Sequence, residues 1–313
     1  MIEARLRTRI SSTELESKVG KILGPQDYNA LLTGPAKLLK PNGQPLVVYL
    51  PGALQAEADT PAVYATLHSL RSLRTDNRGT ASGSRRITRP GSTRSRALNV
   101  PSAIIGAFDA AGAQKYCRLT AWTGQNLPQW ETLRPFLQAI AHHFKTRLPD
   151  RYAVQMAEVE RTFSEWVVPD TPFTTVTVNN TYPTGVHQDA GDLESGFSTL
   201  ACIRRGTFTG GQLVFPKYRV AIDMQHGDLA LIDAHEYHGN TAIVCACGER
   251  RNGMCDTCGA ERISVVSYFR QNMTRCGSYS EEAARAATAA ETRNRKRLAA
   301  QIDAADTPAE VAP

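Results

Sequence analysis

The chain has 313 residues, of which 42% are hydrophobic, and a formal net charge of +6 at pH 7. This length and apolar content are sufficient for one large hydrophobic core or two modest ones. No stretch approaches the roughly 20 apolar residues that a membrane helix requires, so we expect no membrane-spanning segment.

A few short elements are predicted in the first part of the chain. Residues 14–22 favour a short helix, residues 44–50 a strand, and residues 61–73 an amphipathic helix. Proline and glycine at positions 24–25 and 41–43 separate these segments.

An arginine-rich segment follows. It carries eight arginines between residues 71 and 96 against the single acidic residue Asp76. Interleaved glycine, serine and threonine predict a long loop, and arginine with small residues suits contacts to phosphate groups. A solvated charged surface is the alternative.

Two strands and two helices are predicted next. Residues 103–108 and 116–122 favour strands, and Asp109–Gly112 would join them as a pair. Residues 133–146 and 153–163 favour helices.

The first metal-ligand motif is His187-Gln188-Asp189. The β-branched, alternating stretch Thr174–Val178 upstream of it predicts a strand. Residues two apart on extended backbone project to the same side, so His187 and Asp189 can direct two ligands at one point. An H-x-D triplet alone is a weak signal, because it is more often part of a solvated loop.

A third ligand is expected after the apolar strand at 229–233. Both His235 and His238 follow this strand. We favour His238, because the adjacent Gly239 leaves space for a metal, and keep His235 as the alternative ligand or as a group that hydrogen-bonds a ligand. Two imidazoles and one carboxylate on one face of Fe(II) are typical of non-haem iron oxygenases.

Four of the seven cysteines lie within fourteen residues, as the pairs Cys245 and Cys247, and Cys255 and Cys258. C-x-C followed by C-x-x-C fits four thiolates around one structural zinc ion. Reduced surface thiols and disulfides are the alternatives. Because Met1–Arg5 is charged and unlike a signal peptide, we expect an intracellular protein, in a bacterial or phage-host cytoplasm or in a nucleus, without disulfides.

An arginine and a serine open the next predicted strand. Arg262 and Ser264 are two residues apart, so both face away from Ile263 and Val265. An arginine fork beside a hydroxyl would bind a carboxylate in a bidentate manner. A salt bridge from Arg262 to an internal Asp or Glu is the alternative.

The last segment is of a different kind. Glu281 and Glu282 precede an alanine-rich stretch and the basic run 293–297, an order of charges that suits the helix dipole. The stretch lacks a wide apolar stripe, so we expect a marginal surface helix and, over Asp303–Pro313, a disordered tail.

Taken in order, these motifs resemble the 2-oxoglutarate/Fe(II) dioxygenases. Residues 76–79 with 81–83, 102–106 and 117–123 are similar to the TET/JBP branch, which hydroxylates the 5-methyl group of pyrimidines in DNA. The resemblance covers roughly residues 45–275 and is greatest to the compact phage and protist members. The cysteine insert departs from the pattern.

The resemblance implies a mainly β, α+β fold with a double-stranded β-helix, the jelly-roll or cupin-like core. We expect this core at residues 173–271, inside a single catalytic domain of residues 1–275. Fe(II) would be bound by His187, Asp189 and His238. The residues expected to bind 2-oxoglutarate are Arg262, Ser264, Asn179 and Arg118, with Arg118 facing either the keto acid or the DNA and Asn180 a further candidate.

The reaction implied is hydroxylation of 5-methylcytosine in DNA to 5-hydroxymethylcytosine, with dioxygen and 2-oxoglutarate as co-substrates and further oxidation left open. The base would be flipped out of the duplex, because an enclosed iron cannot reach a stacked methyl group. Thymine hydroxylation, N-alkyl repair, protein hydroxylation and an inactive DNA-binding module are the alternatives. We expect a monomer without a membrane partner. The predicted contacts to the DNA backbone are Arg78, Arg85, Arg86, Arg89, Arg94 and Arg96.

Overall fold

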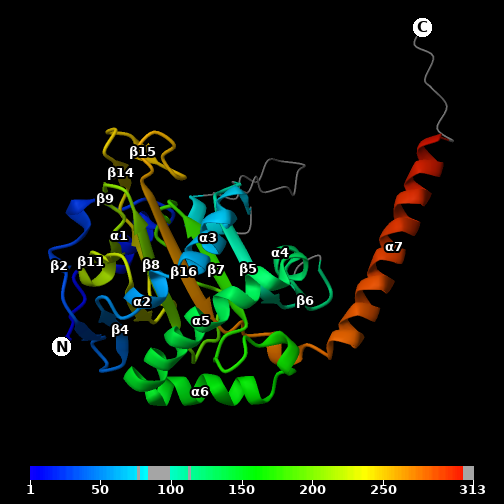
Figure 1. Cartoon of the computed structure of the whole chain (residues 1–313), viewed down its shortest axis with the longest axis horizontal. Coiled ribbons are helices and arrows are strands. Elements are labelled where there is room, and N and C mark those ends of the chain that lie inside the picture. The colour runs from blue at the N-terminus through cyan, green and yellow to red at the C-terminus, as the bar shows by residue number, and fades with distance from the viewer. Residues whose placement is uncertain (76–77, 84–98, 112–113, 306–313) are drawn as a thin grey trace, which may run out of the picture.

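The computed structural model describes residues 1–75, 78–83, 99–111 and 114–305. Two sheets face each other, and helices cover the outer face of the larger sheet (Figure 1). A small third sheet lies at one end of the molecule, and one long C-terminal helix extends away from the body (Figure 1).

The larger sheet has nine strands. In spatial order these are β1 (Ile2–Arg5), β3 (Ala36–Leu39), β4 (Pro45–Leu50), β12 (Asp228–Ile232), β8 (Ser198–Arg205), β16 (Glu261–Tyr268), β7 (Thr175–Asn180), β5 (Ser102–Phe108) and β6 (Arg118–Leu119). All neighbouring pairs are antiparallel except β1 with β3.

The smaller sheet packs against the inner face of the larger one. Its strands, in spatial order, are β13 (Gly239–Asn240), β10 (Leu213–Phe215), β11 (Val220–Ile222) and β2 (Ala30–Leu32). Leu213, Phe215 and Ile222 share an apolar cluster with Ala230 and Ile232 of β12. Two facing sheets of this kind agree with the predicted jelly-roll core.

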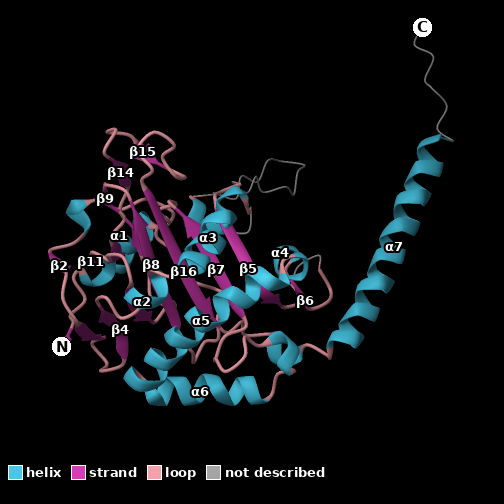
Figure 2. Ribbon diagram, viewed as in Figure 1, coloured by secondary structure: helices cyan, strands magenta, loops and turns pink. Residues whose placement is uncertain are grey.

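Helices form the outer layer (Figure 2). The helices of this layer are α2 (Gln55–Ala58), α3 (Pro61–Ser69), α4 (Ala121–Gln125), α5 (Leu127–Arg147) and α6 (Pro149–Glu160). Helices α1 (Ser12–Lys18) and α7 (Tyr279–Ala305) lie outside it. Helix α5 buries Leu133, Phe136, Leu137, Ile140 and Phe144, whose spacing puts them on one face of a helix. In the described part of the chain, no helix has the length and apolar character needed to cross a membrane.

Strand β16 has one face toward the helices and the other toward the space between the two sheets. Ile263 and Val265 lie in the cluster formed with the helices. Ser264 and Val266 point to the opposite side, into a cavity between the sheets. The predicted opposition of Ser264 to Ile263 and Val265 is therefore confirmed.

Several predicted boundaries are wrong. The main sheet extends outside the predicted core of residues 173–271, because β1, β3, β4, β5 and β6 also belong to it. The predicted pair of strands exists as β5 and β6, but β6 is short and Ala121 already starts a helix. Helix α7 has 27 residues and includes the first part of the predicted disordered tail, of which residues 306–313 lie outside the described part.

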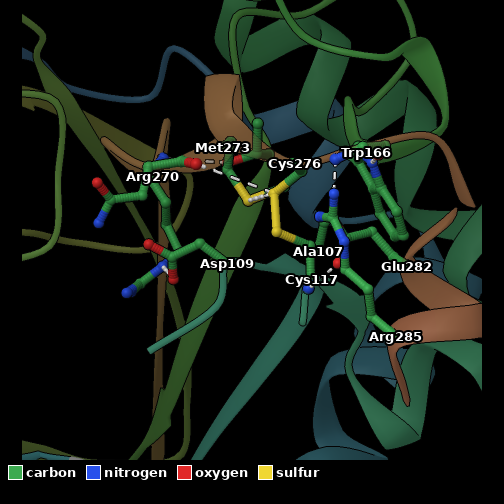
Figure 3. Close-up of a disulfide and its surroundings, with 12 residues drawn as sticks. Ala107, Asp109, Cys117, Trp166, Arg270, Met273, Cys276, Glu282 and Arg285 are labelled. Carbon is green, nitrogen blue, oxygen red and sulfur yellow. Dashed lines mark hydrogen bonds and ion pairs between the residues drawn. A yellow bond between two sulfur atoms is a disulfide. The ribbon is translucent and has the colours of Figure 1, made fainter. Parts of the chain in front are cut away.

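A disulfide joins Cys117 to Cys276 across 159 residues of sequence (Figure 3). It contradicts the expectation of no disulfides, which relied on the sequence of the N-terminus and not on the proximity of these two residues. Next to it, Glu282 of α7 accepts hydrogen bonds from the backbone N–H groups of Cys117 and Gly277, at 2.8 and 2.7 Å. These interactions attach the first turn of α7 to the body of the protein.

Candidate active site

Two histidines and one aspartate meet at the cavity. His187 and His238 lie opposite each other in antiparallel backbone pairing, with N–H to carbonyl distances of 2.9 and 3.0 Å. Asp189 Oδ1 is 3.4 Å from His187 Nε2, and Asp189 Oδ2 is 3.9 Å from His238 Nε2. One potential ligand atom from each residue lies within 4.8 Å of the others, which suits a single metal ion.

Hydrogen bonds orient both imidazole rings. His187 Nδ1 is 2.8 Å from the carbonyl of Gly185, and His238 Nδ1 is 2.9 Å from the carbonyl of Glu236. A carbonyl only accepts, so each Nδ1 is the protonated nitrogen and each Nε2 keeps its lone pair. Both Nε2 atoms face Asp189, where a metal would take them as ligands.

The protonation states also suit metal binding. Burial, with the neighbouring His187, lowers the pKa of His238 to about 4, so its ring is neutral at pH 7. Burial opposes ionisation of Asp189, but its position beside the His187 ring and near the Arg78 guanidinium holds the pKa of that carboxyl well below its usual range. A neutral imidazole and an ionised carboxylate are the forms that bind a divalent metal.

The structure selects His238 over His235. The ring of His235 lies 3.5 Å from Asp233 and is absent from the group of three potential ligands. The neighbouring Asp233 carboxylate raises the pKa of His235.

The cavity has a volume of about 430 Å³ and is lined by polar groups from both sheets and their loops. This volume lies within the range of roughly 300–1,000 Å³ that is common for small-molecule sites. Besides the triad, its polar lining includes Arg78, Asn179, Asp192, Ser264, Tyr268 and Arg270.

Arg262 lies directly behind Ser264. It is 3% exposed, and its Nη1 donates to Ser264 Oγ. Its Nη2 is buried and has no hydrogen-bond partner among the described residues. Within the same part of the chain no carboxylate forms an ion pair with Arg262, so the alternative of an internal salt bridge is not what the structure shows.

Asn179 and Asn180 face opposite sides of β7. Asn179 lies opposite Ser264 in the sheet and lines the cavity, where its Oδ1 accepts from Ser102 Oγ at 2.7 Å. Asn180 donates instead to Glu261 at 2.6 Å, on the side away from the cavity. Asn180 is therefore wrong as a site residue.

Arg118 does not line the cavity, so the structure gives no support to its predicted contact with the keto acid, and a contact with DNA stays a prediction. Its guanidinium lies over the ring of Phe108, 5.3 Å from the ring centroid. The strand on which it lies ends after Leu119, so Arg118 stays at the edge of the sheet. Arg270 occupies the cavity side of Phe108, with its guanidinium 3.9 Å from the ring centroid.

Arg78 is the one predicted DNA contact within the described residues, and it lines the cavity. The other five, Arg85, Arg86, Arg89, Arg94 and Arg96, lie outside the described residues.

Tyr268, Arg270 and Asp192 are cavity residues that the sequence analysis did not assign to the site. The first two could have been found, because they continue the alternation that starts at Arg262 and Ser264. Asp192 follows the H-x-D motif in a loop, where no periodicity indicates its direction.

Comparison with known proteins identifies the family. The Tet_JBP family model, described as the oxygenase domain of the 2OGFeDO superfamily, matches residues 106–271, just over half of the chain. The chain belongs to this family. The match includes the triad, Arg262 and Ser264, and the Tet_JBP resemblance inferred from the motifs is confirmed, as is the assignment to the 2-oxoglutarate/Fe(II) dioxygenases.

Individual curated relatives match more than half of this chain but only a small part of their own length. A thymine dioxygenase JBP1 from Crithidia fasciculata is 30% identical over 190 residues, which are 60% of this chain and 22% of the relative. The JBP1 of Trypanosoma brucei brucei is 31% identical over 171 residues, 54% of this chain and 19% of its own length. The chain thus spans about a fifth of the length of these curated relatives.

A solved structure shows the same fold. NgTET1 in complex with 5mC DNA superimposes with a TM-score of 0.52 and 15% sequence identity, over 85% of this chain and 93% of that one. The likeness supports the jelly-roll fold of this Tet_JBP member.

Proposed function

We propose that this chain hydroxylates the 5-methyl group of a pyrimidine base in DNA, with Fe(II) and 2-oxoglutarate. The proposal is carried by one cavity that presents the ligand atoms of His187, Asp189 and His238 together with Ser264, behind which Arg262 has an unpartnered donor. The relatives named thymine dioxygenase support a methylated base as the substrate.

The triad fits Fe(II) in its chemistry. It offers two neutral imidazole nitrogens and one carboxylate, a set that leaves half of an octahedral metal's positions open. When bound, the iron and 2-oxoglutarate supply the oxidising power for hydroxylating a C–H bond. The protein's own part is to hold the three ligands, orient the base and exclude water around the reacting methyl group.

Arg262 and Ser264 fit the distal carboxylate of 2-oxoglutarate. A buried guanidinium with a free N–H group is costly unless an anion reaches it. Ser264 is exposed to the cavity and already bonded to Arg262, so the two can share one carboxylate. Asn179 lies opposite Ser264 on the neighbouring strand and lines the same cavity, which supports it as a further candidate for a contact with 2-oxoglutarate.

The base itself has two candidates. The sequence analysis favours 5-methylcytosine, and the names of the JBP1 relatives favour thymine. The bases differ at position 4, where cytosine has an amino group and thymine a carbonyl oxygen. The cavity holds both an acceptor, Asp192, and donors such as Arg78 and Gln188, so its chemistry admits either base.

The test is to incubate the protein with Fe(II), 2-oxoglutarate and otherwise identical duplexes that contain 5-methylcytosine or only thymine as the methylated pyrimidine. Nucleoside mass spectrometry then identifies the base that gains oxygen and counts the oxidation steps. Reactions without 2-oxoglutarate, and with the His187→Ala variant, are the controls. The proposal is wrong if neither base is oxidised by iron-loaded protein that binds 2-oxoglutarate.

A further inference from the structure

The cysteine insert forms a compact cluster at the end of the molecule that carries β14 (Ile243–Cys245) and β15 (Arg250–Arg251) (Figure 1). Ligand atoms of Cys245, Cys247, Cys255 and Cys258 all lie within 4.8 Å of one another. None of the four is in a disulfide, although the same chain pairs two other cysteines.

The sulfur positions are those of a tetrahedral metal site. Zn–S bonds of about 2.3 Å in a tetrahedron separate neighbouring sulfur atoms by about 3.8 Å. Cys255 Sγ is 3.7 Å from Cys245 Sγ and 3.9 Å from Cys247 Sγ. After the second cysteine of each pair, Gly248 and Gly259 have φ values of 79° and 65°, which turn the chain back so that both pairs can face one centre.

The surrounding sheet has little else to stabilise it. Strands β9 (Phe208–Gly210), β14 and β15 have three, three and two residues. The apolar cluster beneath them contains Phe208, Ile243, Ala260 and two of the cysteines, Cys245 and Cys255, with Cys258 packed against it. A satellite core of this size is of the kind that small folds supplement with a metal.

Two short hydrogen-bonded paths link the cysteine cluster to the backbone at and next to Arg262. Cys255 N–H donates to the carbonyl of Ala260 at 3.0 Å, two residues before Arg262. Gly253 N–H donates to the carbonyl of Thr181 at 2.9 Å, and Thr181 Oγ1 accepts from the N–H of Arg262 at 3.0 Å. Thr181 has a φ of 46°, a costly conformation for a β-branched residue that these bonds hold in place.

We propose that Cys245, Cys247, Cys255 and Cys258 bind one structural zinc ion. This ion fixes the backbone around Thr181 and Arg262 and so positions Arg262 and Ser264, the carboxylate clamp that would hold 2-oxoglutarate. The link to 2-oxoglutarate rests on the proposed function, whereas the zinc site does not. Arg262 is the residue that would touch the co-substrate, and the cysteines act through it.

Metal analysis of protein purified without chelators tests the zinc site. We expect one tightly bound zinc per chain, retained in His187→Ala, which disables the other candidate metal site, and in Cys202→Ala, which removes a buried thiol outside the cluster. The zinc should be lost in Cys255→Ser/Cys258→Ser. Absence of zinc from the unmodified protein, or its retention in the double variant, would overturn the proposal.

Cobalt substitution covers the case in which the double variant does not fold. Cobalt(II) in a tetrahedral thiolate site absorbs intensely in the visible range, whereas an open site of two histidines and a carboxylate absorbs weakly. We expect the intense bands in the unmodified protein and in His187→Ala, and weaker, shifted bands in the single variant Cys247→Ser, whose side chain is exposed. Unmodified protein that takes up cobalt without the intense bands would contradict four-thiolate ligation.

Calorimetry of 2-oxoglutarate binding tests whether the zinc site positions the carboxylate clamp. It is done without oxygen, so that binding is measured in the absence of turnover. Cys247→Ser from which zinc has been removed, checked for its fold by circular dichroism, should bind 2-oxoglutarate several-fold more weakly than the unmodified protein while its iron content is unchanged. Unchanged affinity in a zinc-free, folded variant would overturn the positioning role and leave the proposed dioxygenase function untouched.

Discussion

Arg262 and Arg270 are both candidates for binding the carboxylate of 2-oxoglutarate, and their hydrogen-bond partners distinguish them. Arg270 lines the cavity, but its Nε donates to Asp109 at 2.7 Å and its guanidinium stacks on Phe108. Arg262 has a buried Nη2 without a partner among the described residues and a hydrogen bond to a serine that lines the cavity. Because an unsatisfied buried donor is costly, Arg262 has more to gain from an incoming carboxylate.

We therefore predict that Arg262→Met raises the KM for 2-oxoglutarate steeply while DNA affinity stays close to that of the unmodified protein. Losing one partner of a buried charge pair costs about 3 kcal/mol, which corresponds to roughly a hundredfold in KM. Steady-state kinetics with varied 2-oxoglutarate measures the change. Arg161→Met, the same substitution at a 68% exposed side chain, is the control. An unchanged KM in Arg262→Met would move the clamp to Arg270.

The triad gives a second prediction. His187→Ala, Asp189→Ala and His238→Ala should each abolish turnover and iron binding, because each removes one of three ligands. His235→Ala should keep most of the activity, since its ring is directed at Asp233. Iron content and product formation are measured together, with circular dichroism to check the fold. Activity that disappears in His235→Ala but persists in His238→Ala would reverse the assignment.

Sequence reasoning succeeded at this scale where backbone periodicity decides direction. The separation of two residues brought His187 and Asp189 to one point and set Arg262 on the same side as Ser264. It did not bring Arg118 to the cavity, because the length of a strand at the edge of a sheet depends on its neighbours and not on its own residues. The partner of Cys117 could not be predicted either, since 159 residues of chain separate it from Cys276.

At the scale of elements, β16 contributes several of the residues that line the cavity. One face of this strand packs on the helices, and the other supplies Ser264, Val266 and Tyr268 to the cavity. Its neighbour β7 adds Asn179. The types of these central strands were predictable from their β-branched, apolar sequences. Their order in the sheet was not, because strands from the first 120 residues enter the same sheet through contacts distant in sequence.

The arginine-rich segment leads to a prediction at this scale. Changing Arg85, Arg86 and Arg89 together to Ala should weaken DNA binding about equally for methylated and unmethylated duplexes, because phosphate contacts carry no base identity. Removing each arginine–phosphate interaction should also reduce the slope of log affinity against log salt by roughly one unit. Fluorescence anisotropy at several salt concentrations measures both.

At saturating DNA the same triple variant should oxidise the same base as the unmodified protein. Exposed lysines changed to Ala elsewhere, such as Lys21, control for net charge. A variant that binds normally but oxidises another base would show that the segment reads bases, and unchanged binding would favour the solvated-surface alternative.

At the scale of the whole molecule, α7 projects from the body and is attached near its start (Figure 1). The disulfide, the two backbone hydrogen bonds to Glu282 and a bond from Trp166 Nε1 to the carbonyl of Gly277 at 2.8 Å all lie at this end (Figure 3). Neither Cys117 nor Cys276 is among the described residues that line the cavity, so the disulfide lies apart from the candidate active site.

The last prediction follows from this separation. Replacing Cys117 and Cys276 together with Ala should lower the free energy of unfolding by about 2–4 kcal/mol, because the crosslink closes a long loop and restricts the unfolded chain. Denaturant unfolding without reductant measures the decrease, and adding reductant should destabilise the unmodified protein but not the double variant. The KM for 2-oxoglutarate should stay the same in both, since Glu282 and Trp166 still hold the start of α7. Equal stability of the two proteins without reductant would show that the disulfide does not form in solution, and a changed KM would show that this end of α7 supports the cavity.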